Sequence, residues 1–122
     1  MNKFLLGRKG EDEAVRFLQD NGYRIVARNV RAKFGEIDVV ARDGAALCFV
    51  EIKARSGLRF GFPEEALTAE KRRRLIRLVQ WYLQRSRPPA GVSIRFDVLS
   101  ILTDSDPHAA RIRLIKGAFE AA

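Results

Sequence analysis

Apolar and polar positions recur with two different periods along the chain, and each period predicts a type of element. Between residues 10 and 21, Ala14, Val15 and Leu18 fall on one stripe, which is the spacing of an amphipathic helix, and Gly22 follows as a stop signal. A longer stripe predicts a second helix over residues 69–86, with Thr68 placed to cap its start.

Runs rich in β-branched and aromatic residues predict five strands, over residues 23–31, 34–42, 46–54, 92–102 and 110–115. A loop is expected over 57–67 and a short helical piece after 115. Helix, three strands, helix, two strands is an order that predicts an α/β fold, a mixed β-sheet of about five strands flanked by helices. With 122 residues, we expect one domain spanning 1–122.

The second and third strands surround Asp43-Gly44 and form a predicted hairpin with four charged residues on it. A two-residue loop would place Asp38 opposite Phe49, whereas a four-residue loop would place Asp38 opposite Glu51. Because side chains alternate along a strand, both registers have the same consequence. One face carries Ile37, Val39, Val50 and Ile52, and the other carries Glu36, Asp38, Glu51 and Lys53.

That charged face has two interpretations. It is either a solvated polar face, or a site where crowded acids, which repel one another across strands, hold a cation. Carboxylates on a rigid scaffold suit Mg²⁺ or Mn²⁺. In the second interpretation Asp38 and Glu51 bind the metal, and Lys53 orients a water molecule or neutralises charge on a phosphoryl group. This mechanism requires Asp38 and Glu51 to share a face of the sheet.

Three further residues are candidates near this hairpin. Glu11 lies on the apolar stripe of the first helix, where it is either a helix-start acid favoured by the macrodipole or a third metal or water ligand. Lys71 lies on the stripe of the second helix, despite an unfavourable position near a helix start, and Glu36 is a candidate supporting residue. Asp97 is expected to be a structural partner for a base.

The formal net charge of +8 and the pI of about 10.4 favour a polyanionic partner, nucleic acid first and an anionic membrane second. No apolar run approaches a membrane span, and the N-terminal residues do not resemble a signal peptide. The single cysteine, Cys48, is expected to be a small buried residue. We therefore expect a cytoplasmic protein without a membrane association.

Basic residues near the hairpin and the second helix predict a phosphate-contact surface, although such runs are also common on solvated faces. Those on the helix are Arg72, Arg73, Arg74 and Arg77, and those that flank the hairpin are Arg28, Arg31, Lys33, Arg55 and Arg59.

Several blocks of the sequence resemble one known family: "KGEDEAVRFLQDNGY", "NVRAKFGEIDVVARDG", "CFVEIKAR", "FGFPEEALTAEKRRRL" and "RFDVL". They are similar to the YraN-type proteins, small bacterial proteins for which an endonuclease activity is proposed. These are similar in turn to archaeal Holliday junction resolvases and to the restriction-endonuclease-like superfamily with its D…(E/D)-x-K signature. The resemblance covers about residues 7–119.

The resemblance implies a restriction-endonuclease-like fold and a Mg²⁺-dependent endonuclease acting on DNA, branched DNA included. The signature falls on Asp38, Glu51 and Lys53, and the glutamate of the resolvases' first helix falls on Glu11. Ile37 replaces the superfamily's proline. Because resolvases are dimers, a homodimer is one option. The alternative function is a nucleic-acid-binding module that keeps the fold and cleaves little or not at all.

Overall fold

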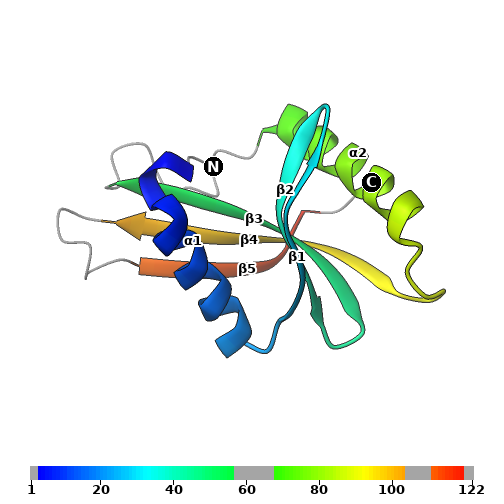
Figure 1. Ribbon diagram of the computed structural model, residues 1–122, viewed down its shortest axis with the longest axis horizontal. Coiled ribbons are helices and arrows are strands. Elements are labelled where there is room, and N and C mark those ends of the chain that lie inside the picture. Colours follow the sequence, from blue (N-terminus) through cyan, green and yellow to red (C-terminus); the bar gives the residue numbers. More distant parts are fainter. Residues whose placement is uncertain (1–2, 57–67, 104–110, 120–122) are drawn as a thin grey trace.

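A computed structural model describes residues 3–56, 68–103 and 111–119, and the burial of side chains within 10–54, 68–101 and 112–118 (Figure 1). The elements are α1 (Lys3–Asp20), β1 (Arg24–Ala32), β2 (Gly35–Asp43), β3 (Ala46–Ser56), α2 (Ala69–Ser86), β4 (Ser93–Thr103) and β5 (Arg111–Phe119). This order confirms the predicted α/β fold. Two bounds were wrong: α1 begins at Lys3 rather than residue 10, and residues 116–119 continue β5 instead of starting a helix.

The five strands form one mixed sheet in the order β1-β2-β3-β4-β5. Neighbours pair antiparallel except β3 and β4, which run parallel from Ala46↔Ser93 to Ser56↔Thr103. A parallel pair needs a long crossover connection, and the chain between β3 and β4 contains α2. α2 therefore belongs to the connection that follows β3, the strand that carries Glu51 and Lys53.

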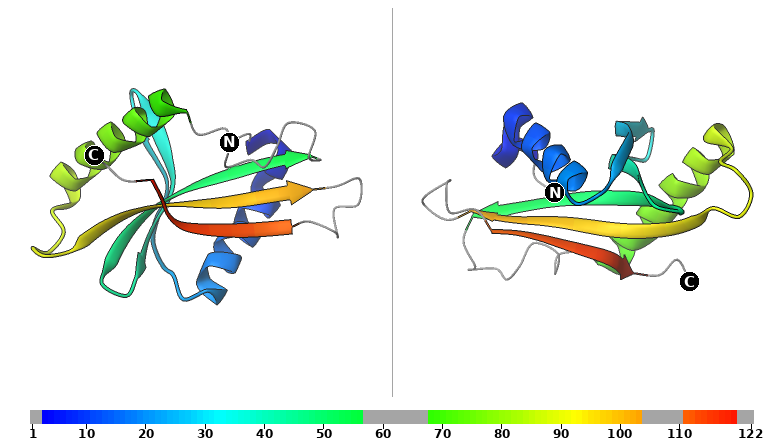
Figure 2. Two further views of the ribbon diagram at one scale, coloured as in Figure 1. Left: turned by 180° about the vertical axis from the view of Figure 1, so that it is seen from behind. Right: turned by 90° about the horizontal axis from the view of Figure 1, so that it is seen from below.

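Alternate residues of β3 belong to two different cores, so α1 and α2 pack on opposite faces of the sheet. Cys48, Val50 and Ile52 join the core formed with α1, whereas Leu47 and Phe49 join the core formed with α2. Figure 2 shows the helices toward opposite ends of the twisted sheet. Burial of Cys48 is as expected, and it raises the pKa of the thiol to about 12.

Local signals in the sequence fix the ends of both helices. The Thr68 hydroxyl accepts a hydrogen bond from the Lys71 backbone N–H at 3.2 Å, which confirms the predicted cap of α2. Gly22 has a φ of 90°, in the left-handed region, and the Tyr23 N–H then reaches the Leu18 carbonyl at 3.0 Å. No helix in the described part of the chain has the length and apolar character needed to cross a membrane.

The hairpin between β2 and β3 turns through Gly44-Ala45, with Asp43 paired to Ala46, rather than through Asp43-Gly44. The pairs Val40↔Phe49 and Val39↔Val50 give the register that we had expected from a four-residue loop. The described ladder ends at Val39↔Val50, one residue before Asp38 and Glu51.

Alternation along β2 breaks at this same level. Ile37 packs with Val40 in the α2-side core, whereas Val39 packs in the α1-side core, so the prediction that Ile37 and Val39 share a face was wrong. At the same level of β1, Asn29 has a φ of 51°, in the left-handed region, between Arg28 and Val30, which pair with Val39 and Ile37.

Candidate functional site

A pocket of about 300 Å³ opens between the end of β3 and the first turns of α2. We call it the α2-side pocket. Its charged lining consists of Glu36, Glu51, Lys53, Lys71 and Arg74, and its remaining lining consists of Gly35, Leu75 and Leu78. Five of the predicted site residues therefore line one pocket: Glu36, Glu51, Lys53, Lys71 and Arg74.

Gly35 allows β2 to approach α2 closely beside this pocket. A Cβ at position 35 would lie 3.0 Å from Leu78 Cδ1 and 3.4 Å from Arg74 Cδ. That first distance is shorter than ordinary van der Waals contact, so a larger residue would push the helix or its side chains outward. No local pattern in the sequence indicates this close contact of Gly35, because it depends on tertiary packing.

Glu51 and Lys53 form an ion pair at the base of the pocket, with Lys53 Nζ 3.5 Å from Glu51 Oε1. Their side chains are 16% and 6% exposed, respectively. Removing two charges from water is costly, and the cost is repaid only by their mutual attraction and by further polar contacts. An ion pair with so little exposure at the wall of a pocket is therefore a candidate for a functional role.

Lys71 adds a second ammonium group to the same pocket. The pKa of Lys71 lies below its ordinary value, chiefly because the Lys53 charge is close and secondly because burial penalises the charged form. Arg74 completes the positive side of the pocket; it also lies 3.9 Å from Glu70 on the exposed side of the helix. Lys71 thus lines the same pocket as Glu51 and Lys53, and its role there stays a prediction.

Glu36 bridges the pocket and the surface. Its Oε2 atom lies 3.4 Å from Nε of Arg31, whose side chain is largely exposed, while its Oε1 atom is buried. Glu36 thus lies between the pocket and the exposed side chain of Arg31, and its role as a supporting residue stays a prediction.

Asp38 departs from the expected arrangement. Its Oδ2 atom accepts a hydrogen bond of 2.8 Å from the Ile52 backbone N–H, and the residue is 6% exposed. The carboxylate thus binds β3 just beyond the last described pair of the ladder. Asp38 also lines a separate narrow pocket of about 10 Å³ with Glu11, Arg28 and Asn29, next to core residues of the α1 side. Asp38 and Glu51 therefore line different pockets, and the prediction that they share one face of the sheet stays a prediction.

The fit of this region to a divalent cation is incomplete. In the part of the chain that the structure describes, no three side chains among His, Cys, Asp and Glu gather closely enough to hold a metal ion. The oxygen donors of Asp38 and Glu51 still have the right chemistry, because Mg²⁺ in proteins is commonly bound through one or two carboxylates and keeps several waters. Glu11 lies with Asp38 rather than with Glu51.

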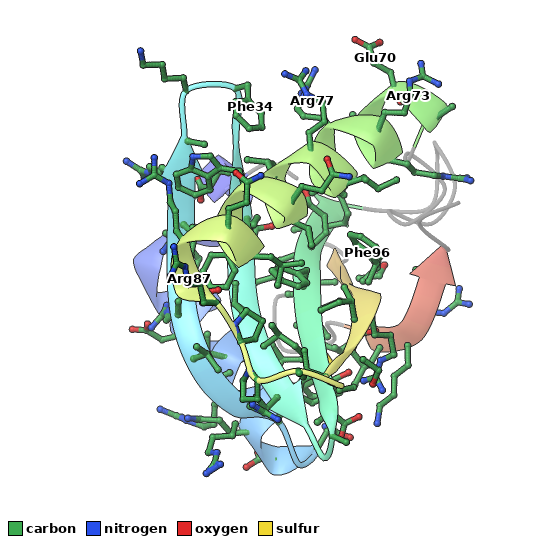
Figure 3. All side chains as sticks on the ribbon, turned by 90° about the vertical axis from the view of Figure 1, so that its right-hand side faces the viewer. Phe34, Glu70, Arg73, Arg77, Arg87 and Phe96 are labelled. Atoms are coloured by element: carbon green, nitrogen blue, oxygen red, sulfur yellow. The ribbon has the colours of Figure 1, made fainter. Side chains whose placement is uncertain are left out.

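The predicted basic surface divides into parts. Arg72, Arg73, Arg74 and Arg77 are exposed on α2, and Lys33 is exposed at the β1–β2 turn. Figure 3 shows Arg73 and Arg77 on the outward side of α2, with Phe34 beside Arg77. The Arg77 guanidinium stacks 4.9 Å from the Phe34 ring centroid.

Of the remaining predicted bases, Arg28 and Arg31 belong to β1 and Arg55 belongs to β3. Arg28 pairs with Asp12 at 2.8 Å and lines the narrow pocket beside Asp38. The Arg55 side chain and all of Arg59 lie outside the described residues. The contribution of Phe34 was missed, because nothing in its position between Lys33 and Gly35 indicates contact with a helix far along the chain.

Asp97 on β4 is a second buried acid, and together with Glu51 it lines a further small pocket of about 10 Å³. Asp97 is 1% exposed and accepts hydrogen bonds from the Tyr23 hydroxyl, the Gly117 N–H and two nitrogens of Arg95. Arg95 also donates to Asp43 at 2.8 Å. The predicted structural role of Asp97 beside a base is confirmed. We call these residues, with Lys116, which donates to Asp43, the Asp97 network.

Fold and site together define a small α/β protein with a mixed sheet and a buried acid–lysine pair that faces a basic helix. The chain belongs to the uncharacterised protein family UPF0102, whose model matches residues 10–101. This match confirms the YraN-type resemblance and includes both pockets.

Similar proteins from distant bacteria share almost the whole chain. A UPF0102 protein of Symbiobacterium thermophilum is 51% identical over 118 residues, covering 95% of this chain and 97% of the relative. One of Nocardia farcinica is 50% identical over 118 residues, covering 97% and 91%. One of Lachnoclostridium phytofermentans is 46% identical over 121 residues, covering 99% and 98%.

Proposed function

We propose that this protein is a metal-dependent endonuclease of the restriction-endonuclease-like type that hydrolyses phosphodiester bonds in DNA, branched or otherwise structured DNA included. One observation carries the proposal: a buried glutamate–lysine pair, two residues apart on one strand, faces a pocket whose opposite wall is a basic helix. Such a pocket combines a carboxylate and an amine, which can bind a metal ion or transfer a proton, with bases of α2 that can bind phosphate.

The proposal gives separate roles to Lys53, to Glu51 and to the exposed arginines of α2. Lys53 places a positive charge beside the phosphoryl oxygens, where negative charge grows during hydrolysis. Glu51 holds Lys53 in position through the 3.5 Å pair. The exposed arginines of α2 bind flanking phosphates and fix the register of the strand without reading its sequence.

The proposed cofactor is Mg²⁺ or Mn²⁺, with Asp38 and Glu51 as its carboxylate ligands and Glu11 as a further acid near Asp38. When bound, the metal would supply an activated water molecule and stabilise charge on a phosphoryl oxygen. Asp38 contributes in a second way, because its bond to the Ile52 N–H fixes the backbone next to Glu51.

A second candidate function is a nucleic-acid-binding module that has the nuclease fold but cleaves little. A specific observation favours it: Asp38 and Glu51 line different pockets. In that case the basic helix and the α2-side pocket bind the backbone, and the acids are retained for stability.

The test is a cleavage assay on labelled duplex, single-stranded and four-way-junction DNA with Mg²⁺ or Mn²⁺. We expect cleavage by the wild type and a loss of at least roughly 100-fold in Glu51→Gln and in Lys53→Met. Glu13→Gln is the matched control, since Glu13 is exposed on α1 and the change in charge is the same.

Two results would reject the nuclease proposal. One is an absence of cleavage on every substrate with either metal. The other is cleavage by Glu51→Gln and Lys53→Met at the rate of Glu13→Gln. Salt-dependent DNA binding without cleavage would support the binding module instead.

A further inference from the structure

The α2-side pocket carries an excess of positive charge from its own side chains. Lys53, Lys71 and Arg74 contribute three formal positive charges, and Glu36 and Glu51 contribute two negative charges. The bases come from two elements that meet only in the folded protein, β3 and α2. The pocket is therefore a preformed anion site rather than a run of solvated lysines on one helix.

We propose that this pocket is a phosphate-binding subsite that works without a metal ion: Lys71 and Arg74 of α2, together with Lys53 of β3, hold one phosphate group of the nucleic acid backbone. This assignment rests on the proposed function, because it states where the substrate sits in the same site. It gives Lys71 a binding role that is separate from the Asp38–Glu51 pair.

The proximity of Lys53 and Lys71 is the first argument. Two ammonium groups at one pocket repel each other in the ligand-free protein, and the lowered pKa of Lys71 reflects this repulsion together with burial. An anion between the two ammonium groups would turn that repulsion into two attractions. Lys53 is 5% exposed, so its attraction for the anion is weakly screened by solvent.

The placement of Lys71 and Arg74 is the second argument. Residues three apart on a helix point to the same side, and both of these line the pocket. The 3.9 Å contact between Arg74 and Glu70 joins two largely exposed side chains, so little energy is lost if Arg74 turns toward a ligand. A guanidinium also matches the geometry of phosphate oxygens through two parallel hydrogen bonds.

Glu36 provides the means to separate an anion site from a merely structural cluster. Its carboxylate shares the pocket with the three bases, so it opposes the entry of a phosphate by like-charge repulsion. Neutralising Glu36 should therefore strengthen phosphate binding, whereas removing the Lys71 charge should weaken it. A variant that is only destabilised would not bind more tightly, so a gain in affinity cannot come from misfolding.

The experiment measures the Kd of the full chain for a short labelled DNA duplex in EDTA, by fluorescence anisotropy over a series of salt concentrations. For Lys71→Met we expect a Kd roughly tenfold higher and a salt slope smaller by about one. Lys71→Arg should restore most of the affinity, and Glu36→Gln should lower the Kd by roughly threefold. Arg16→Met, which removes one exposed charge from α1, is the matched control and should change the Kd by less than about twofold.

The proposal is overturned if Lys71→Met binds DNA like Arg16→Met, or if Glu36→Gln binds no more tightly than the wild type. Cleavage assays with Mg²⁺ on the same preparations separate the two proposals. The expected pattern of Kd values without cleavage would reject the nuclease and leave the subsite standing. Cleavage with the same Kd for wild type and Lys71→Met would reject the subsite and leave the nuclease standing.

Discussion

Two carboxylates on neighbouring strands, the buried Asp97 on β4 and the partly buried Glu51 on β3, differ in their hydrogen-bond partners. Asp97 accepts four hydrogen bonds, two of them from Arg95, and the residue is 1% exposed. Glu51 pairs with Lys53 at a longer distance of 3.5 Å and lines the α2-side pocket with two further bases.

The difference distinguishes an acid whose hydrogen bonds hold the fold from an acid that lines a pocket. Burial alone would raise the pKa of Asp97, but the bonds from Arg95, Tyr23 and the Gly117 N–H outweigh it and lower the pKa below its usual range. All of those donors belong to the protein, so no place remains for an incoming group. At the α2-side pocket the charges are only partly matched to one another, and the pocket gives a ligand access to them.

The largest expected effect comes from breaking the Asp97 network. Asp97→Asn leaves the Arg95 charge without its main partner, and loss of one member of a buried pair costs about 3–5 kcal/mol. Urea denaturation should show the loss in the free energy of unfolding, and the matched change Glu51→Gln should cost clearly less. Equal losses for Asp97→Asn and Glu51→Gln would remove the distinction between the two acids.

Acid should weaken the Asp97 network selectively. Since the folded-state pKa of Asp97 is lowered, its stabilisation is present above the unfolded pKa of about 3.9 and is lost as the pH falls through the folded value. Asp43 adds to this trend, because hydrogen bonds from Arg95 and Lys116 lower its pKa too. Denaturation curves from pH 6 down to pH 2 should therefore show a fall in stability that is much shallower in Asp97→Asn, and parallel curves would contradict this origin.

Asp38 should combine the behaviour of both acids. Asp38→Ala leaves the buried Ile52 N–H without its acceptor, at a cost of about 1–3 kcal/mol. Asp38→Asn keeps a carbonyl oxygen at that place, so thermal unfolding should return close to the wild type while cleavage does not recover. If Asp38→Asn is as unstable as Asp38→Ala, then the charge of Asp38 rather than its hydrogen bond supports the fold.

The smallest expected effect has the opposite sign. Lys71→Met removes one of two neighbouring positive charges, Lys53 on β3 and Lys71 on α2, and should raise the free energy of unfolding by about 0.5 kcal/mol, the size of one relieved like-charge contact. Chemical denaturation at low salt measures it, and the gain should shrink at high salt because screening reduces the repulsion. A loss of stability would show that Lys71 supports the fold through contacts of its stem.

Sequence patterns predicted the elements well, because helix and strand periods and the Thr68 cap are local signals. The grouping of Glu51 with Lys53 also followed from strand alternation. The hydrogen bond from the Ile52 N–H to Asp38 and the separation of Ile37 from Val39 did not follow from it, because both depend on how β2 packs between its neighbouring strands. The approach of Lys71 to Lys53 depends on how α2 packs on the sheet, which periodicity places only on the correct side.

The parallel pairing of β3 with β4 has a consequence for when the pocket exists. Antiparallel neighbours β1, β2 and β3 follow one another along the chain, so their contacts close short loops and can form early. The pairing of β3 with β4 must enclose the whole connection that contains α2, and such nonlocal pairing forms slowly. We therefore expect Glu51 and Lys53 to be placed early on this meander, whereas the core under α2, which includes Phe96 of β4, is complete only when the sheet closes. A chain still being synthesised would carry the acid–lysine pair without the wall that faces it, so we expect DNA binding at this pocket to appear only once β4 has been added.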